Sequence, residues 1–88
     1  MSLHVGMVVQ ACAGKEKDGF YLIVNTDQKF VFLADGRHRT IRKPKRKNPR
    51  HVRPTQIIWN PDGMTDKALR QKLRLLKEGN KFVERRFD

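Results

Sequence analysis

Short apolar runs alternate with polar turns along the first two thirds of the chain. The runs at residues 5–11, 20–24 and 29–34 are rich in β-branched and aromatic residues, which favour strands. A further short run, residues 55–59, follows Pro54. Because proline has no backbone N–H to donate, we expect this run either to form an edge strand or to have Pro54 at the start of the strand.

Glycine-containing turns separate these runs. Residues 14–19 form a polar turn with a glycine at each end, and glycine tolerates the positive φ angles of tight turns. Asp35 and Gly36 directly follow the third run, and this pair is typical of a type I′ hairpin. The pair predicts another strand over residues 37–41, with its basic side chains on a sheet edge.

The pattern changes to a helical period after the Pro-Asp-Gly turn at residues 61–63. Thr65 is a good N-cap, and Asp66 carries the charge that favours a first turn. These signals predict a helix over residues 66–78. Gly79 is expected to end it.

Three leucines recur at helical spacing in this segment. Leu69, Leu73 and Leu76 share one face, and we interpret them as a stripe that docks on the sheet or on a partner protein. The neighbouring cations are interpreted as a solvated face: Arg70, Lys72, Arg74 and Lys77.

Short strands with turn signals about every 8–12 residues, followed by a helix, indicate a mainly β fold. We expect a small twisted sheet of four to five strands that closes into a barrel, with a C-terminal α-helix. At 88 residues the chain buries only a small core. We divide it into a barrel, residues 1–59, and an appended turn, helix and tail, residues 60–88.

Charge changes this picture most. Twenty Lys and Arg against nine Asp and Glu give a net charge of +11, which favours anionic partners. Nucleic acid is the first candidate, and an anionic membrane surface is the second. Nine of these cations lie in residues 35–53 beside one acidic residue, Asp35. Pro44 and Pro49 restrict the backbone there, so we expect residues 42–50 to form a semi-stiff surface loop with its charges splayed out.

Patterns for catalysis are missing from the sequence. The histidines are far apart, no Cys/His pair has zinc spacing, and there is no nucleotide-binding glycine motif. We expect neither an enzyme nor a metal, cofactor or small-molecule substrate. Cys12 is a lone cysteine, which fits a reducing, cytoplasmic setting, and it is interpreted as a small buried side chain. We expect no secretory leader, no membrane-spanning run and no membrane partner.

Two groups of residues resemble a known family. Gly-Met-Val-Val at residues 6–9, the turn at 14–19 and the run at 20–24 resemble the KOW motif, with Gly19 as its characteristic glycine. Leu-Ala-Asp-Gly-Arg at 33–37, the basic run and His-Val-Arg-Pro-Thr at 51–55 are similar to KOW-containing RNA-binding proteins of bacteria. These are similar in turn to a KOW-bearing large-subunit ribosomal protein family of archaea and eukaryotes.

The resemblance implies an SH3-like barrel that binds RNA and associates with the ribosome, through ribosomal RNA or the large subunit, in translation. It departs from the family at three places. The turn at 14–19 is longer than usual, Phe20 stands where a basic residue often follows the glycine, and residues 57–64 have no counterpart.

The expected function is therefore non-catalytic RNA binding through phosphates. About five to seven contacts would give a log–log salt slope near −4, since each contact with a single strand contributes about 0.7. Of the aromatic side chains, Tyr21 and Trp59 are the stacking candidates, whereas Phe20, Phe30 and Phe32 are interpreted as core. The candidate RNA contacts are Lys15, Lys17, Arg37, Arg39, Arg42, Lys43, Lys45, Arg46, Lys47, Arg50 and Arg53.

Three alternatives stay open at this point. An SH3-like module could bind a protein, either on the barrel or through the helix stripe of Leu69, Leu73 and Leu76. A duplex DNA binder would need a recognition helix, and none is evident in the sequence. The Lys/Arg run could also be a nuclear localisation signal.

Overall fold

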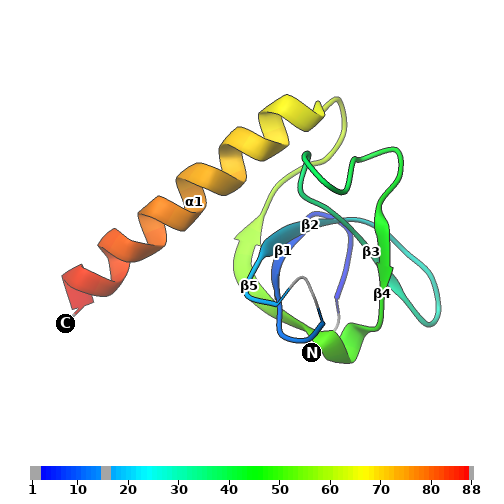
Figure 1. Cartoon of the computed structure of the whole chain (residues 1–88), viewed down its shortest axis with the longest axis horizontal. Coiled ribbons are helices and arrows are strands. Elements are labelled where there is room, and N and C mark those ends of the chain that lie inside the picture. Colours follow the sequence, from blue (N-terminus) through cyan, green and yellow to red (C-terminus); the bar gives the residue numbers. More distant parts are fainter. Residues whose placement is uncertain (1–2, 15–16, 88) are drawn as a thin grey trace.

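The fold is a five-stranded antiparallel sheet with a long helix alongside it (Figure 1), seen in a computed structural model that describes residues 3–14 and 17–87, with side chains up to residue 78. The mainly β, small barrel-like fold expected from the sequence is confirmed. The elements in chain order are β1 (Met7–Ala11), β2 (Phe20–Thr26), β3 (Val31–Ala34), β4 (Lys45–Lys47), the 3₁₀ turn η1 (Pro49–His51), β5 (Val52–Ile58) and α1 (Asp66–Phe87).

The strand order is β4-β3-β2-β1-β5, so the last strand pairs with the first. Register shifts between Met7 and Val9 and between Ile23 and Asn25 mark bulges, which bend the strands and help the sheet to curl. Pro54 lies in β5, an end strand in this order, as expected for a residue that donates no hydrogen bond.

The strand predicted over residues 37–41 is wrong, because this segment forms turns and bends. The partner of β3 is β4, which lies within the segment expected to be a loop. A type I′ turn needs two positive φ angles. Gly36 has one, at +78°, but Asp18 is the sole non-glycine residue with positive φ in the described part of the chain, so Asp35 does not supply the other.

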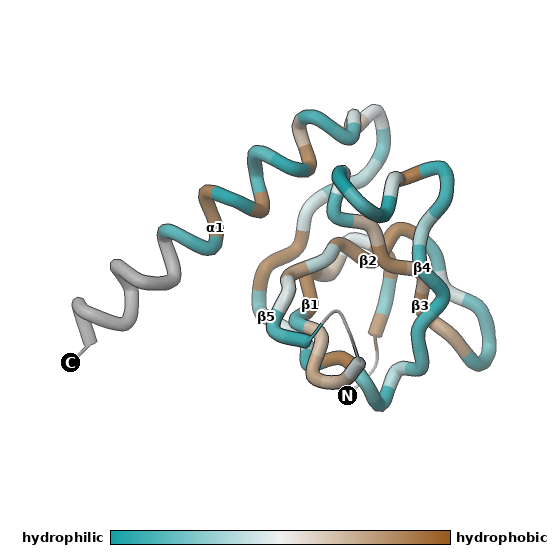
Figure 2. The backbone as a smooth tube through the Cα atoms, in the orientation of Figure 1, coloured by the Kyte–Doolittle hydropathy of each residue, from teal (hydrophilic) through white to brown (hydrophobic). Residues whose placement is uncertain are grey.

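The sheet carries apolar side chains on both faces of its central strands. The interior cluster contains Met7, Val9, Ala11, Tyr21, Ile23, Val31, Leu33 and Val52. The outer cluster, under α1, contains Val8, Leu22, Ala34, Leu69 and Leu73. Strands buried on both faces have continuous apolar runs rather than alternating ones, which explains the pattern of residues 20–24. Figure 2 shows this apolar sheet beside a largely hydrophilic loop between β3 and β4.

Helix α1 begins and docks as expected, but it does not end as expected. The Oγ1 atom of Thr65 accepts a hydrogen bond from the amide N of Ala68 at 3.1 Å, so the N-cap prediction is confirmed. Leu69 and Leu73 are buried against the sheet and Leu76 is partly buried there. The stop at Gly79 is wrong, because α1 continues to Phe87; one interior glycine costs a helix only about 1 kcal/mol.

Candidate functional site

The basic loop between β3 and β4, residues 35–44, starts with a tight turn closed by Asp35. The Oδ1 atom of Asp35 accepts hydrogen bonds from the amide N atoms of Arg37 and Arg39, both at 2.9 Å. The carbonyl O of Arg39 accepts in return from the amides of Asp35 and Gly36, at 2.9 and 3.0 Å. This side-chain bonding to nearby amides is the turn-forming role that aspartate often has.

The same loop is fixed to the first turns of α1. The Oδ1 atom of Asp66 accepts a hydrogen bond from the amide of Ile41 at 2.8 Å, and Nη1 of Arg70 donates to the carbonyl O of Gly36 at 2.8 Å. Gly36 is buried, and a Cβ atom there would overlap the carbonyl oxygen of Asp66. The loop therefore has a defined shape, although almost no apolar side chain orders it.

The predicted contacts divide into exposed and less exposed cations. Arg39 and Lys45 are half-buried. Lys15 lies outside the described residues. The exposed members are Lys17, Arg37, Arg42, Lys43, Arg46, Arg50 and Arg53.

The prediction that Lys47 is exposed as an RNA contact is corrected by the structure. The Lys47 side chain is only 8% exposed, and its Nζ donates a hydrogen bond to the carbonyl O of Ala13 at 3.1 Å. It lies opposite Val31, an interior residue, whereas Arg46 lies opposite Phe32. Because side chains alternate along a strand, β4 places Lys47 against the turn after β1 and leaves Arg46 outside.

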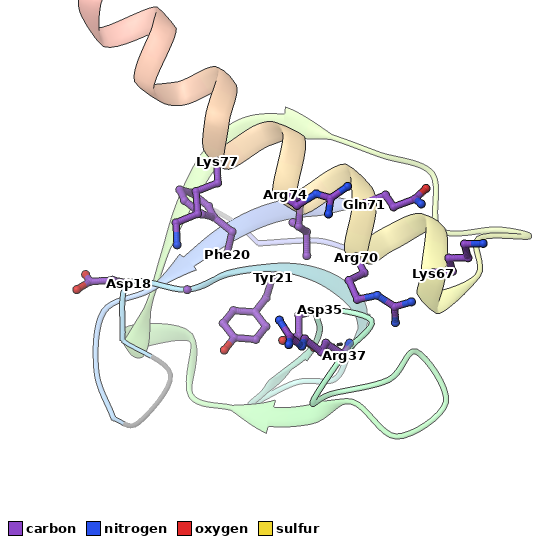
Figure 3. A pocket seen from close by; sticks show the side chains of 12 residues that line it. Asp18, Phe20, Tyr21, Asp35, Arg37, Lys67, Arg70, Gln71, Arg74 and Lys77 are labelled. Carbon is purple, nitrogen blue, oxygen red and sulfur yellow. Dashed lines mark hydrogen bonds between the residues drawn. The ribbon is translucent and has the colours of Figure 1, made fainter.

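The structure also brings three cations of the predicted solvated face, Arg70, Arg74 and Lys77, together with Lys67 and Arg37. A groove of about 700 Å³ lies between α1, the start of β2 and the turn at Asp35 (Figure 3). The cations that line it are Arg37, Lys67, Arg70, Arg74 and Lys77. The four on α1 follow one another at spacings of three and four residues, so they form a stripe next to the leucines. That spacing is the sequence signal that could have found the groove.

Three of the acidic side chains near these surfaces bond to backbone amides instead of neutralising the cations. Asp35 and Asp66 accept from loop amides, as above, and Oδ1 of Asp27 accepts from Lys29 N at 2.8 Å and Phe30 N at 2.7 Å. The hydrogen bond from Lys29, followed by that from Phe30, lowers the pKa of the Asp27 carboxyl. Among the described side chains, no ion pair joins a groove cation to a carboxylate.

Among the side chains that the structure describes, exposed aromatic surface is scarce and differs from the expectation. Tyr21 is buried, at 8% exposure, so it is not available for stacking on a base. Trp59 is half-buried, with Nζ of Lys72 5.2 Å from its ring centroid. Phe30, expected in the core, is half-buried and carries the guanidinium of Arg46 at 4.7 Å.

Two other expectations can be compared with the structure. Cys12, interpreted as a buried side chain, is exposed, and its Sγ lies 3.8 Å from the carbonyl O of Arg50. Leu69 and Leu73 are covered by the sheet, so a partner could reach them only by displacing α1.

Within the described residues, no three His, Cys, Asp or Glu side chains are placed to hold a metal ion. None of the helices in that part of the chain has the length and apolar character to cross a membrane. Comparison with protein-family models and with curated protein sequences gave no match. The resemblance to KOW proteins therefore rests on the motif residues alone.

Proposed function

We propose that this protein binds RNA without catalysing a reaction, by contacting phosphates from its basic loop and the exposed cations that follow it. The observation that carries the proposal is a loop of fixed shape in which most cations are exposed, while Asp35 and Asp66 accept hydrogen bonds from loop amides. Its exposed cations are Arg37, Arg42 and Lys43, and the exposed cations that follow it are Arg46, Arg50 and Arg53.

A fixed loop favours binding for a physical reason. Ordering a flexible cationic segment on RNA would cost conformational entropy, and here Asp35 and Asp66 already hold the backbone. Arginine adds geometry to charge, because its planar guanidinium can donate two parallel hydrogen bonds to one phosphate.

RNA is preferred over other polyanions because of the KOW resemblance at residues 6–24 and 33–55. The same resemblance supports a cytoplasmic role on ribosomal RNA or the large ribosomal subunit. The scarcity of exposed aromatic rings among the side chains up to residue 78 fits a protein that recognises backbone and shape more than base sequence.

The test is a matched pair of double variants. Arg42→Gln with Lys43→Gln removes two charges from the loop, and Lys29→Gln with Lys72→Gln removes two from other elements. With a log–log slope of about 0.7 per contact, lowering the salt concentration from 1 M to 0.1 M raises the affinity about fivefold for each phosphate contact. We expect the loop variant to bind a structured ribosomal RNA fragment about 25-fold more weakly, with a salt slope shallower by about 1.4.

Fluorescence anisotropy at several salt concentrations measures both quantities. The control variant should keep the slope of the wild type, because net charge alone makes no local contact. Equal losses in the two variants would contradict the proposed surface. Duplex DNA that competes as well as the same mass of RNA would contradict RNA as the partner.

A further inference from the structure

We propose that one strand of the bound RNA runs from the basic loop into the groove between α1 and β2, with its phosphates on the helix cations. This inference rests on the proposed RNA binding and extends its surface from the loop onto α1. The helix cations concerned are Lys67, Arg70, Arg74 and Lys77.

The groove is continuous with the loop because Arg37 belongs to both. Arg37 follows the Asp35 turn, and its side chain lines the groove opposite the stripe on α1 (Figure 3). Asp18 and Gly19, at the end of the turn after β1, line the other end. Three elements that are distant in sequence thus form the walls of one channel.

Arg70 is oriented before any ligand arrives. Its Nη1 donates to the carbonyl O of Gly36 at 2.8 Å, which joins the helix wall to the loop wall. A guanidinium has five N–H donors, so those not used in this bond are left for a phosphate. A side chain that is already held loses less entropy on binding than a free one.

The composition of the groove favours a nucleic-acid strand over a simple anion. Its volume of about 700 Å³ lies in the range of sites that bind small organic ligands, about 300–1,000 Å³. Phe20 and Leu73 supply an apolar wall for a sugar or base beside the cations.

The charge balance points in the same direction. Five cations line the groove against two carboxylates, and Oδ1 of Asp35 already accepts from two amides. In the described part of the chain no ion pair neutralises these cations. Like charges around one groove repel, and a phosphate between them relieves that repulsion.

The test compares three single substitutions on one helix. Arg74→Gln and Lys77→Gln each remove a groove cation, and Lys72→Gln removes an equal charge that lies over Trp59 instead. Arg74 and Lys77 are exposed, so their loss should leave folding intact, which urea unfolding checks. Arg70 is avoided because its bond to Gly36 also supports the loop.

We expect each groove variant to weaken binding to a single-stranded RNA oligonucleotide about fivefold at 0.1 M salt, with a slope shallower by about 0.7. Lys72→Gln should keep the slope. In a parallel titration of isotopically labelled wild type, the Nε–Hε signals of Arg37 and Arg74 should shift as RNA is added.

The outcomes separate the two proposals. Groove variants that behave like Lys72→Gln, while loss of Arg42 and Lys43 still weakens binding, overturn the groove and leave the RNA-binding proposal standing. A wild type that binds no RNA overturns both. Slopes reduced at Arg74 and Lys77 but not at Lys72 support the groove.

Discussion

The two halves of the basic segment look alike in sequence and are built differently. Residues 35–44 form a loop that is held in place by hydrogen bonds to the carboxylates of Asp35 and Asp66. The cations of this loop are exposed or half-buried. Residues 45–53 contain a strand, a 3₁₀ turn and the start of β5. In β4, successive side chains point to opposite faces of the sheet, so that Arg46 is exposed and Lys47 is buried.

The difference teaches that a cation's role follows from the backbone that carries it. At the loop, the carboxylates of Asp35 and of Asp66 on α1 bond to loop amides and leave the positive charges unneutralised. In β4, one lysine acts as a structural hydrogen-bond donor while its neighbour lies on an aromatic ring. Counting Lys and Arg along the sequence therefore overestimates the number of exposed cations, and does so more in the strand half than in the loop half.

Among the changes considered for residues 35–44, substitution of Gly36 is expected to lower the unfolding free energy most. In Gly36→Ala the new Cβ would overlap the carbonyl oxygen of Asp66, and the residue would keep a φ of +78° that alanine disfavours. Strain and overlap together should cost about 3 kcal/mol or more of unfolding free energy. Urea unfolding measures the loss, and hydrogen exchange at the Ile41 amide, which donates to Asp66, reports release of the loop.

Gly63→Ala is the matched control for this prediction. Gly63 also has positive φ, at +73°, but a Cβ there meets no atom within 4 Å. Only the backbone strain of about 1 kcal/mol should therefore appear. Equal losses in the two variants would show that the approach of the loop to α1 contributes nothing.

For residues 45–53, the test replaces Arg46 or Lys47 with methionine, which keeps most of the side-chain stem. Lys47→Met leaves the carbonyl O of Ala13 without its ammonium donor and should cost about 1–3 kcal/mol. Arg46→Met removes a contact between a cation and the Phe30 ring, worth about 0.5–1 kcal/mol at an exposed site. Denaturant unfolding of the two variants gives both values.

RNA binding should rank the same two variants in the opposite order. Arg46→Met is expected to lower the salt slope by about 0.7, since it removes an exposed candidate contact. Lys47→Met should keep the slope of the wild type at temperatures where it is folded. A lower slope for Lys47→Met would contradict its assignment as a structural residue.

The sequence predicted the fold well because its signals are local. Apolar runs give β1, β2 and β3, and Thr65 with the leucine spacing gives the start and the docking face of α1. The failure at residues 37–41 has a physical cause. Asp35 followed by Gly36 fits both a two-residue hairpin and an aspartate-capped turn, and the deciding contact, Gly36 against Asp66, is distant in sequence.

The candidate site was predictable only in part for the same reason. The exposed cations of the loop follow from composition, but the burial of Lys47 depends on how β4 pairs with β3. The groove needs the packing of α1 on the sheet to bring Arg74 near Arg37. The spacing of three and four residues between the α1 cations is nevertheless present in the sequence, and it places them on one face of the helix next to the leucines.

The smallest expected effect concerns the turn that faces the strand half. The amides of Lys29 and Phe30 bond to the Asp27 carboxylate and lower its pKa, and Arg46 adds a weaker attraction. A lowered folded-state pKa means that the contribution to stability is present above the unfolded value and is lost as the pH falls through the folded one. NMR titration of the Asp27 side-chain carbon should show a midpoint below that of an ordinary aspartate. Arg46→Met should move that midpoint up only slightly, because the amides dominate; a return to the ordinary value would assign the effect to Arg46 instead.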